Sequence, residues 1–79
     1  MTREEVFEKM NEVFRDVFDD EDITVTDATT ADDIEDWDSL EHINLINAME
    51  QEFGVKFTMG EIVKLKNVGE MADLIISKL

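Results

Sequence analysis

The 79-residue sequence predicts an all-α fold, a four-helix bundle with a long loop between the first and second helices and a short third helix. In four segments, apolar residues recur at the spacing of an amphipathic helix. Each of these segments begins with a residue type that caps helices, and no pair of segments shows the alternation typical of strands. Because such helices bury their apolar stripes against one another, we expect a single domain over residues 1–79.

The first predicted helix covers residues 2–18. Its apolar residues share one face: Val6, Phe7, Met10, Val13, Phe14, Val17 and Phe18. Thr2 and Glu5 have the spacing of a capping box, in which each side chain accepts a hydrogen bond from the other residue's backbone N–H. The sequence therefore defines where this helix begins.

Residues 19–37 show no helical periodicity and are rich in Asp and Thr, which predicts a long loop. A loop of this length in a small domain usually has a function or packs against the domain. Four apolar side chains are candidates for pinning the loop to the bundle: Ile23, Val25, Ile34 and Trp37. For Trp37, we favour burial of its large ring over an exposed functional role.

The second predicted helix covers residues 39–53, with Asp38 as its N-cap and Gly54 as the left-handed residue that ends it. A helical wheel places five apolar residues on one core-facing stripe: Ile43, Leu45, Ile46, Met49 and Phe53. Leu40 falls outside this stripe, so we expect it to be exposed. His42 lies near the stripe without a second His or a Cys, so a structural role is predicted.

Two further helices complete the predicted bundle. Thr58-x-x-Glu61 repeats the capping-box spacing and begins a short helix with the apolar residues Ile62, Val63 and Leu65. Asn67-x-x-Glu70 begins the last helix. Its apolar residues again share a face: Val68, Met71, Leu74, Ile75 and Leu79.

The chain is strongly acidic, with a net charge of -14, and residues 19–38 hold ten acids and no base. This charge repels phosphate backbones and anionic lipids, so we expect basic protein surfaces as partners, and neither nucleic acid nor membrane. No segment approaches the roughly 20 apolar residues of a membrane span, and the N-terminus lacks a signal-peptide core. We therefore expect a cytoplasmic protein. We also expect a monomer.

The acidic segment suggests calcium binding as a different class of function. A calcium-binding EF-hand loop requires Gly at its sixth position and Glu at its twelfth. Counted from Asp20, those positions hold Val25 and Ala31, so the match fails. Because the chain also has no Cys and a single His, we predict no metal site.

Ser39 is the residue whose position has the clearest chemical meaning. It is one of two serines and lies in the first turn of the second predicted helix, directly after Asp38. Free N–H groups and the helix dipole at that end stabilise a phosphodiester formed on its hydroxyl. Position alone is also typical of an ordinary first-turn serine. The other serine, Ser77, lies in the last turn of the fourth predicted helix and lacks these features.

The residues around Ser39 resemble the acyl carrier protein family. Asp38-Ser39-Leu40 matches the attachment motif of that family, and the likeness extends over essentially the whole chain. Further matching residues are Asp36, Trp37, Ile43, Leu45, Met49, Glu50, Phe53 and Gly54. The resemblance implies a freestanding, bacterial-type carrier that is not an enzyme. A phosphopantetheinyl transferase, using coenzyme A and magnesium, would join a 4′-phosphopantetheine arm to Ser39, and the terminal thiol would hold acyl groups as thioesters.

The resemblance also implies partner enzymes that transfer or activate acyl groups and dock through basic surfaces. The candidate contacts are Leu40, Glu41, Asn44, Asn47 and Glu50. For Leu40, packing against the loop remains equally open, and for the two glutamates a solvated face with little energetic role remains open. The family's common fatty-acid members tend to carry acids where this chain has Asn44 and Asn47. This difference puts service to an ordinary fatty acid synthase in doubt and leaves polyketide and other specialised pathways open.

Two alternatives remain open beside this interpretation. The first is an aminoacyl or peptidyl carrier, and the second is a helical adaptor without a prosthetic group, for which the motif would be a coincidence. In the carrier family the bundle interior also admits an acyl chain, so the apolar stripes can serve both as core and as a cargo site.

Overall fold

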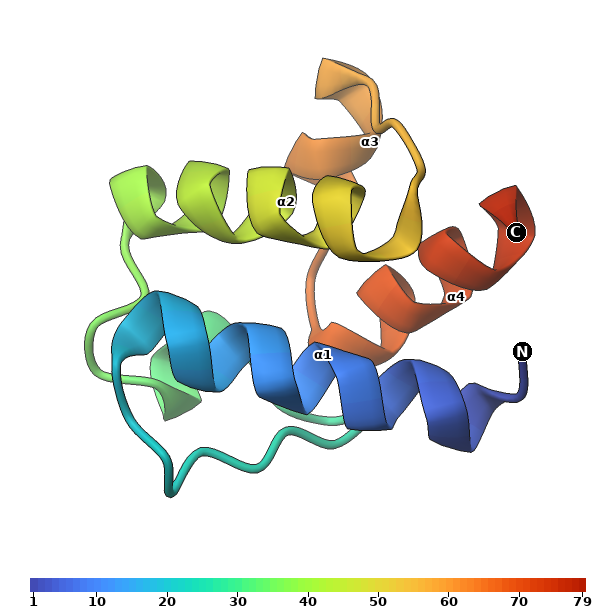
Figure 1. Cartoon of the computed structure of the whole chain (residues 1–79). Helices are drawn as coiled ribbons and strands as arrows, with labels where there is room; N and C mark the ends of the chain where they lie inside the picture. Colours follow the sequence, from blue (N-terminus) through green and yellow to red (C-terminus); the bar gives the residue numbers. More distant parts are fainter.

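The computed structural model describes all 79 residues and contains four α-helices and one 3-10 turn. The elements are α1 (Arg3–Phe18), η1 (Ala31–Asp33), α2 (Ser39–Phe53), α3 (Met59–Lys64) and α4 (Val68–Lys78). Helices α1 and α2 lie side by side and run in opposite directions, and α4 packs against α1 (Figure 1). The predicted all-α bundle with a long first loop and a short third helix is confirmed.

Side chains cap the start of all four α-helices, as predicted. Each capping residue accepts a hydrogen bond from the backbone N–H three residues later: Thr2, Asp38, Thr58 and Asn67. At Thr58 the capping box is reciprocal, and the backbone N–H of Thr58, together with Lys78, holds the pKa of Glu61 below its ordinary value. Helix α2 ends at Gly54, which adopts a left-handed φ of 66°.

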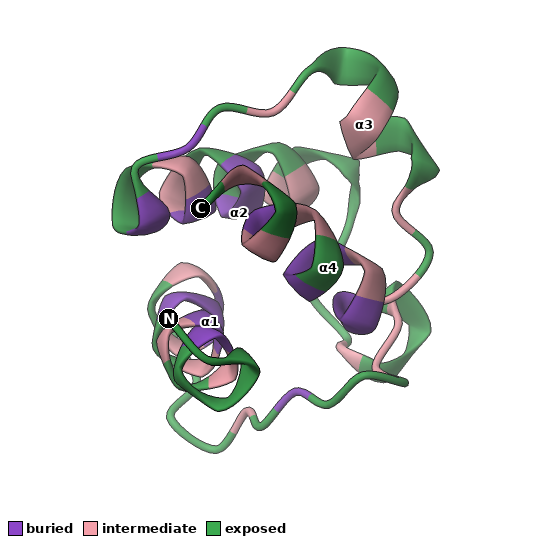
Figure 2. Cartoon of the chain, turned by 90° about the vertical axis from the view of Figure 1, so that its right-hand side faces the viewer, coloured by how far each residue is buried: buried purple, intermediate pink, exposed green.

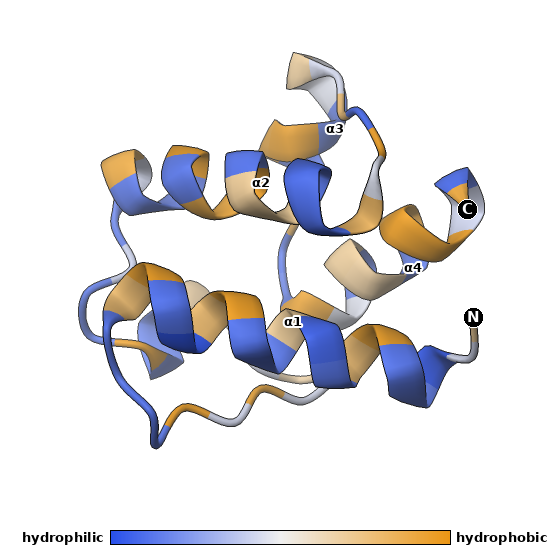
Figure 3. Cartoon of the chain, in the orientation of Figure 1, coloured by the Kyte–Doolittle hydropathy of each residue, from blue (hydrophilic) through white to orange (hydrophobic).

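The hydrophobic core lies between α1, α2 and α4, whose buried positions face one another (Figure 2). The facing surfaces of α1 and α2 are also the apolar ones, with the charged residues turned outward (Figure 3). The largest fully buried side chains are Phe14, Met10, Leu45, Ile46, Met49, Met71, Ile75, Val6 and Val68. Helix α3 contributes no buried residue, so one flank of α2 stays open.

Two residues that the sequence assigned to buried stripes are exposed. Ile43 is 55% exposed because it lies at the edge of the α2 stripe, where the six-residue helix α3 does not cover it. Leu79 is 54% exposed because it lies beyond Lys78, the last helical residue of α4, so the helical wheel no longer places it. Leu40 is 67% exposed, as predicted.

The loop between α1 and α2 packs against the bundle. Val25 is buried, and the other three predicted anchors are partly buried against the core: Ile23, Ile34 and Trp37. Polar groups of α1 hold the loop as well, since the Asn11 Oδ1 accepts from the Val25 N–H at 2.7 Å and the Arg15 Nε donates to the Ile23 carbonyl at 2.7 Å. The sequence does not predict η1 because a three-residue turn has no periodicity to detect.

Gly69 holds the start of α4 close to the loop. Its backbone N–H donates to the Asp27 carbonyl at 3.1 Å, and a Cβ at Gly69 would lie 2.8 Å from that same oxygen. Gly69→Ala is therefore expected to lower the free energy of unfolding by about 1–3 kcal/mol, measured by urea denaturation. Gly60→Ala is the control, because a Cβ there meets nothing within 4 Å and alanine favours helix. Equal losses of stability in the two variants would contradict this contact.

The acidic loop predicts a salt-dependent stability. Its ten acids have no base within residues 19–38, so their repulsion opposes folding. Raising ionic strength from about 10 mM to about 150 mM shortens the screening length from about 30 Å to about 8 Å. We expect a rise in Tm of about 4–8 °C, equivalent to about 1 kcal/mol, in a thermal melt. A Tm that stays constant over this range would show that repulsion in the loop does not limit stability.

Candidate functional site

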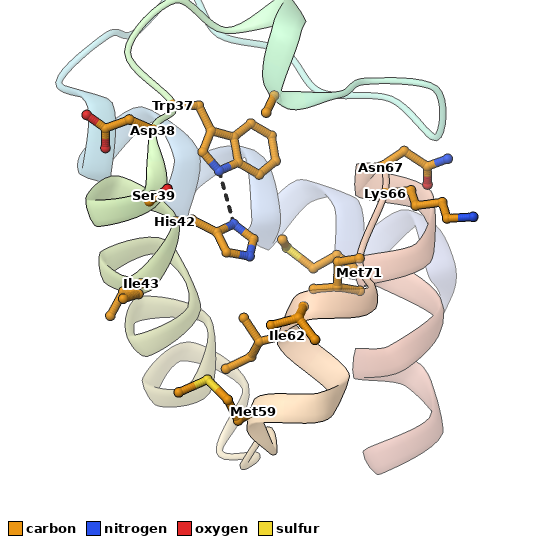
Figure 4. Close-up of a pocket in the computed structure, with 13 residues that line it drawn as sticks. Trp37, Asp38, Ser39, His42, Ile43, Met59, Ile62, Lys66, Asn67 and Met71 are labelled. Carbon is orange, nitrogen blue, oxygen red and sulfur yellow. Dashed lines mark hydrogen bonds between the residues drawn. The ribbon is translucent and has the colours of Figure 1, made fainter.

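The predicted site residue Ser39 is the first residue of α2 and is exposed. Asp38 adopts an extended backbone before it, and the Asp38 Oδ1 accepts from the Glu41 N–H at 2.8 Å, which starts the helix at Ser39. No hydrogen bond joins the Ser39 hydroxyl to the residues around it (Figure 4). The hydroxyl is therefore accessible, and the dipole of the 15-residue helix favours negative charge beside it.

A groove of about 550 Å³ opens beside Ser39, between α2, α3 and the start of α4 (Figure 4). Most of its lining is apolar: Trp37, Ile43, Met59, Ile62, Val63, Leu65 and Met71. This volume and lining are typical of a small-molecule site. The groove also explains why Ile43, Met59 and Val63 are exposed, since they surround an opening that no element of the chain fills.

Trp37 joins the loop to both the core and the groove. Its ring packs edge-on against Phe14, with 5.3 Å between ring centroids, and stacks on His42 at 5.8 Å. The Trp37 Nε1–H donates to the His42 Nδ1 at 3.1 Å. Trp37 therefore packs against the core as predicted, although its ring is only partly buried, and His42 has a packing contact with it. The sequence did not show that both side chains also line the groove beside Ser39.

The predicted partner-contact residues divide into two groups. Three are exposed on one face of α2, which we call the outer face: Leu40, Asn44 and Asn47. The two glutamates are half-buried and make internal hydrogen bonds. The Glu41 carboxylate accepts from the Asn44 side chain at 3.1 Å, and the Glu50 carboxylate accepts from the Phe57 N–H at 2.8 Å. Glu50 thus anchors the segment after α2.

Sequence reasoning missed the far wall of the groove, which comes from α3 and from the start of α4. A helix of six residues is too short for its periodicity to show which side faces α2. The apolar residues of α3 were the available signal, since a helix with no fully buried residue presents part of its apolar surface outside the core. No cluster of side chains has the arrangement of a metal site, and none of the helices is long and apolar enough to cross a membrane.

Comparison with known proteins connects this site to one family. The protein-family model described as "Phosphopantetheine attachment site" matches residues 8–75. An acyl carrier protein of Petrotoga mobilis is 42% identical over 80 aligned positions, which cover all of this chain and 93% of the relative. An acyl carrier protein of Thermosynechococcus vestitus is 36% identical and is covered over 98% of its length.

A solved structure gives the same result for the fold. The solution NMR structure of the holo acyl carrier protein from Geobacter metallireducens superimposes with a TM-score of 0.87 at 48% identity. The match covers 92% of this chain and 84% of that protein. The family model, the relatives and the fold agree, and the chain belongs to the acyl carrier protein family, whose members carry acyl groups on 4′-phosphopantetheine and are not enzymes.

Proposed function

We propose that Ser39 is the attachment site of the 4′-phosphopantetheine arm, within a single carrier domain over residues 1–79. The observation that carries this proposal is the exposed Ser39 hydroxyl, which lies at the N-terminus of α2 and at the rim of the apolar groove. The second serine is unsuitable, because Ser77 lies near the C-terminal end of α4 and its hydroxyl donates to the Leu74 carbonyl at 2.7 Å.

Residues of the chain itself place Ser39 for this modification and stabilise its product. A phosphopantetheinyl transferase would join the Ser39 Oγ to the phosphorus of coenzyme A that carries pantetheine. The bond from that phosphorus to adenosine 3′,5′-bisphosphate would break, and the hydroxyl proton would pass to a base of the transferase. Asp38 fixes the serine at the helix start, and the first N–H groups of α2 favour the charge of the resulting phosphodiester. When bound, the arm supplies a thiol, which the polypeptide lacks, and the groove offers an apolar surface to an acyl chain.

Intact-mass measurement tests this proposal. The chain is incubated with coenzyme A, magnesium and a broad-specificity transferase. We expect a mass gain of one phosphopantetheinyl group, which peptide mapping assigns to Ser39. An unmodified chain, under conditions that load a control carrier, would refute the proposal.

We also propose that the outer face of α2 contacts the acyl-handling partner enzymes. Leu40 offers a 67% exposed apolar side chain next to the arm, and Asn44 and Asn47 make the rest of this face neutral. Partners that recognise carriers through basic patches associate faster when the carrier presents complementary charge. A neutral outer face therefore favours service in a specialised acyl-transfer pathway over an ordinary fatty acid synthase.

Adding charge to the outer face is expected to improve recognition by fatty-synthase enzymes. The variant is Asn44→Glu with Asn47→Glu, and the assay is malonyl transfer to the arm-bearing carrier. We expect the apparent KM to fall by roughly threefold to tenfold at low salt, because the new charges speed encounter, and the gain to shrink as salt screens them. The maximal rate is expected to change little.

The matched control for this variant is Asn44→Gln with Asn47→Gln, which alters the same side chains without adding charge. It is expected to behave as wild type. Leu40→Ala is expected to weaken transfer with or without the added charges. The specialised-carrier proposal fails if wild type performs as well as an acidic-faced carrier and the double Glu change brings no benefit.

A further inference from the structure

The hydrogen bond between Trp37 and His42 fixes where the imidazole carries its proton. An indole N–H can only donate, so the His42 Nδ1, 3.1 Å away, must be an unprotonated acceptor. A neutral imidazole with a bare Nδ1 carries its proton on Nε2. Because the Trp37 ring stacks on His42 and packs edge-on against the buried Phe14, the orientation of the imidazole is held as well.

The Nε2–H group of His42 faces the groove. His42 lies three residues after Ser39 on the same helix face and lines the groove. Figure 4 shows its second ring nitrogen directed away from Trp37, toward the space between α2 and Met71. The hydrogen bond with Trp37 uses only Nδ1 of His42. Because every buried side-chain nitrogen and oxygen in the structure has a hydrogen-bond partner, Nε2 is not buried. The Nε2–H is therefore a donor open to whatever enters the groove.

The other polar side chains around the groove are committed elsewhere. The Asp38 carboxylate caps α2 and the Asn67 Oδ1 caps α4, accepting from the Glu70 N–H at 2.8 Å. The Asn67 amide as a whole points away from the groove (Figure 4). The Lys66 amine points away from the groove (Figure 4). His42 is thus the polar group that an acyl chain meets inside an otherwise apolar lining.

We propose that the His42 Nε2–H selects acyl cargo that carries an oxygen acceptor, a carbonyl or hydroxyl group close to the thioester, over alkyl cargo of the same length. This inference rests on the proposed attachment at Ser39. The thioester carbonyl is common to both kinds of cargo, and beyond it a plain alkyl chain that lies against Nε2–H displaces water without offering an acceptor. An oxygenated chain replaces the lost hydrogen bond, and sites built around a hydrogen bond discriminate against analogues that lack the partner.

The test compares the chain with a bare arm, with a hexanoyl arm and with a β-hydroxyhexanoyl arm, each loaded at Ser39 and verified by intact mass. The readouts are the Tm and the ¹⁵N NMR signals of the imidazole. We expect the β-hydroxyhexanoyl form to melt about 4 °C above the hexanoyl form and to shift the Nε2–H resonance. The free chain is expected to show the Nε2–H tautomer before any loading.

Three variants separate selection by His42 from general packing. His42→Leu removes the donor, so the difference in Tm between the two cargoes is expected to disappear. His42→Gln places an amide N–H in a similar position and is expected to keep it. Trp37→Phe preserves the aromatic packing but frees the tautomer, so the free chain is expected to show a mixture of tautomers and a smaller difference between cargoes.

Several outcomes would overturn the inference. Equal Tm values and an unchanged imidazole in the two loaded forms would refute it, and so would a difference that persists in His42→Leu. If the bare arm shifted the Nε2–H resonance by as much as the β-hydroxyhexanoyl arm does, the acceptor would belong to the arm, and selection of cargo by His42 would be rejected. A chain that does not load refutes the proposed function and this inference together, whereas a chain that loads without discriminating refutes this inference alone.

Discussion

Ser39→Ala is expected to abolish attachment of the phosphopantetheine arm completely. The substitution removes the hydroxyl oxygen at the start of α2 on which the phosphodiester would form, and the chain's other serine lies in α4. Incubation with coenzyme A, magnesium and a transferase should leave the mass of the variant unchanged, while wild type gains one arm. The expected loss is total, since attachment requires this one atom.

The control variants show whether such a loss is chemical or structural. Ser77→Ala should load as wild type does. Ser39→Ala should retain the wild-type Tm to within a few degrees, because the side chain is exposed and Asp38, which caps α2, is unchanged. An arm found on the Ser39→Ala variant would move the attachment site elsewhere. A folded variant without an arm keeps it at Ser39.

The parts of the fold that the sequence predicted are those decided by local chemistry. A capping residue and the amide three positions later are close in the chain, so all four helix starts could be located from residue types alone. Gly54 was readable as the end of α2 for the same reason. Ser39 became a candidate because its meaning depends on a helix start, which is itself a local feature.

The groove could not be predicted from the sequence, because it depends on which part of the α2 surface the short helix α3 leaves uncovered. Ile43 satisfies the spacing of the α2 stripe, yet its burial depends on the length and position of a neighbouring helix. The role of His42 had the same limit. Its sequence neighbours indicate a structural residue, but only the packed position of Trp37 shows which nitrogen is occupied and which one faces the groove.

The family comparisons and the structure contribute different parts of the functional conclusion. The relatives establish an acyl carrier protein, and they leave open the cargo and the partner enzymes. We propose that the partner enzymes depend on the neutral outer face of α2 and that the cargo depends on the groove lined by His42. Variants of Asn44, Asn47 and His42 address them directly.

Phe14→Ala is expected to cause the largest loss of stability in the chain. Phe14 is fully buried in α1, and its ring contacts both Phe18, at 6.0 Å between centroids, and Trp37, at 5.3 Å. Truncating a buried phenylalanine costs about 3–5 kcal/mol. A domain of this size is stable by only about 4–12 kcal/mol, so the variant should be partly unfolded or melt far below wild type.

The same substitution should also loosen the site, because Phe14 supports Trp37 and Trp37 orients His42. Trp37 is the only tryptophan, so its fluorescence reports on this contact without interference. In Phe14→Ala we expect emission shifted toward that of an exposed indole, even under conditions where circular dichroism shows that the helices persist. Phe7→Ala is the matched control, since Phe7 lies on the same helix but is only half-buried, and it should cost less and leave the Trp37 emission unchanged. If Phe14→Ala cost no more than Phe7→Ala and left the emission of Trp37 as in wild type, then Phe14 would not be the support that positions the loop beside Ser39.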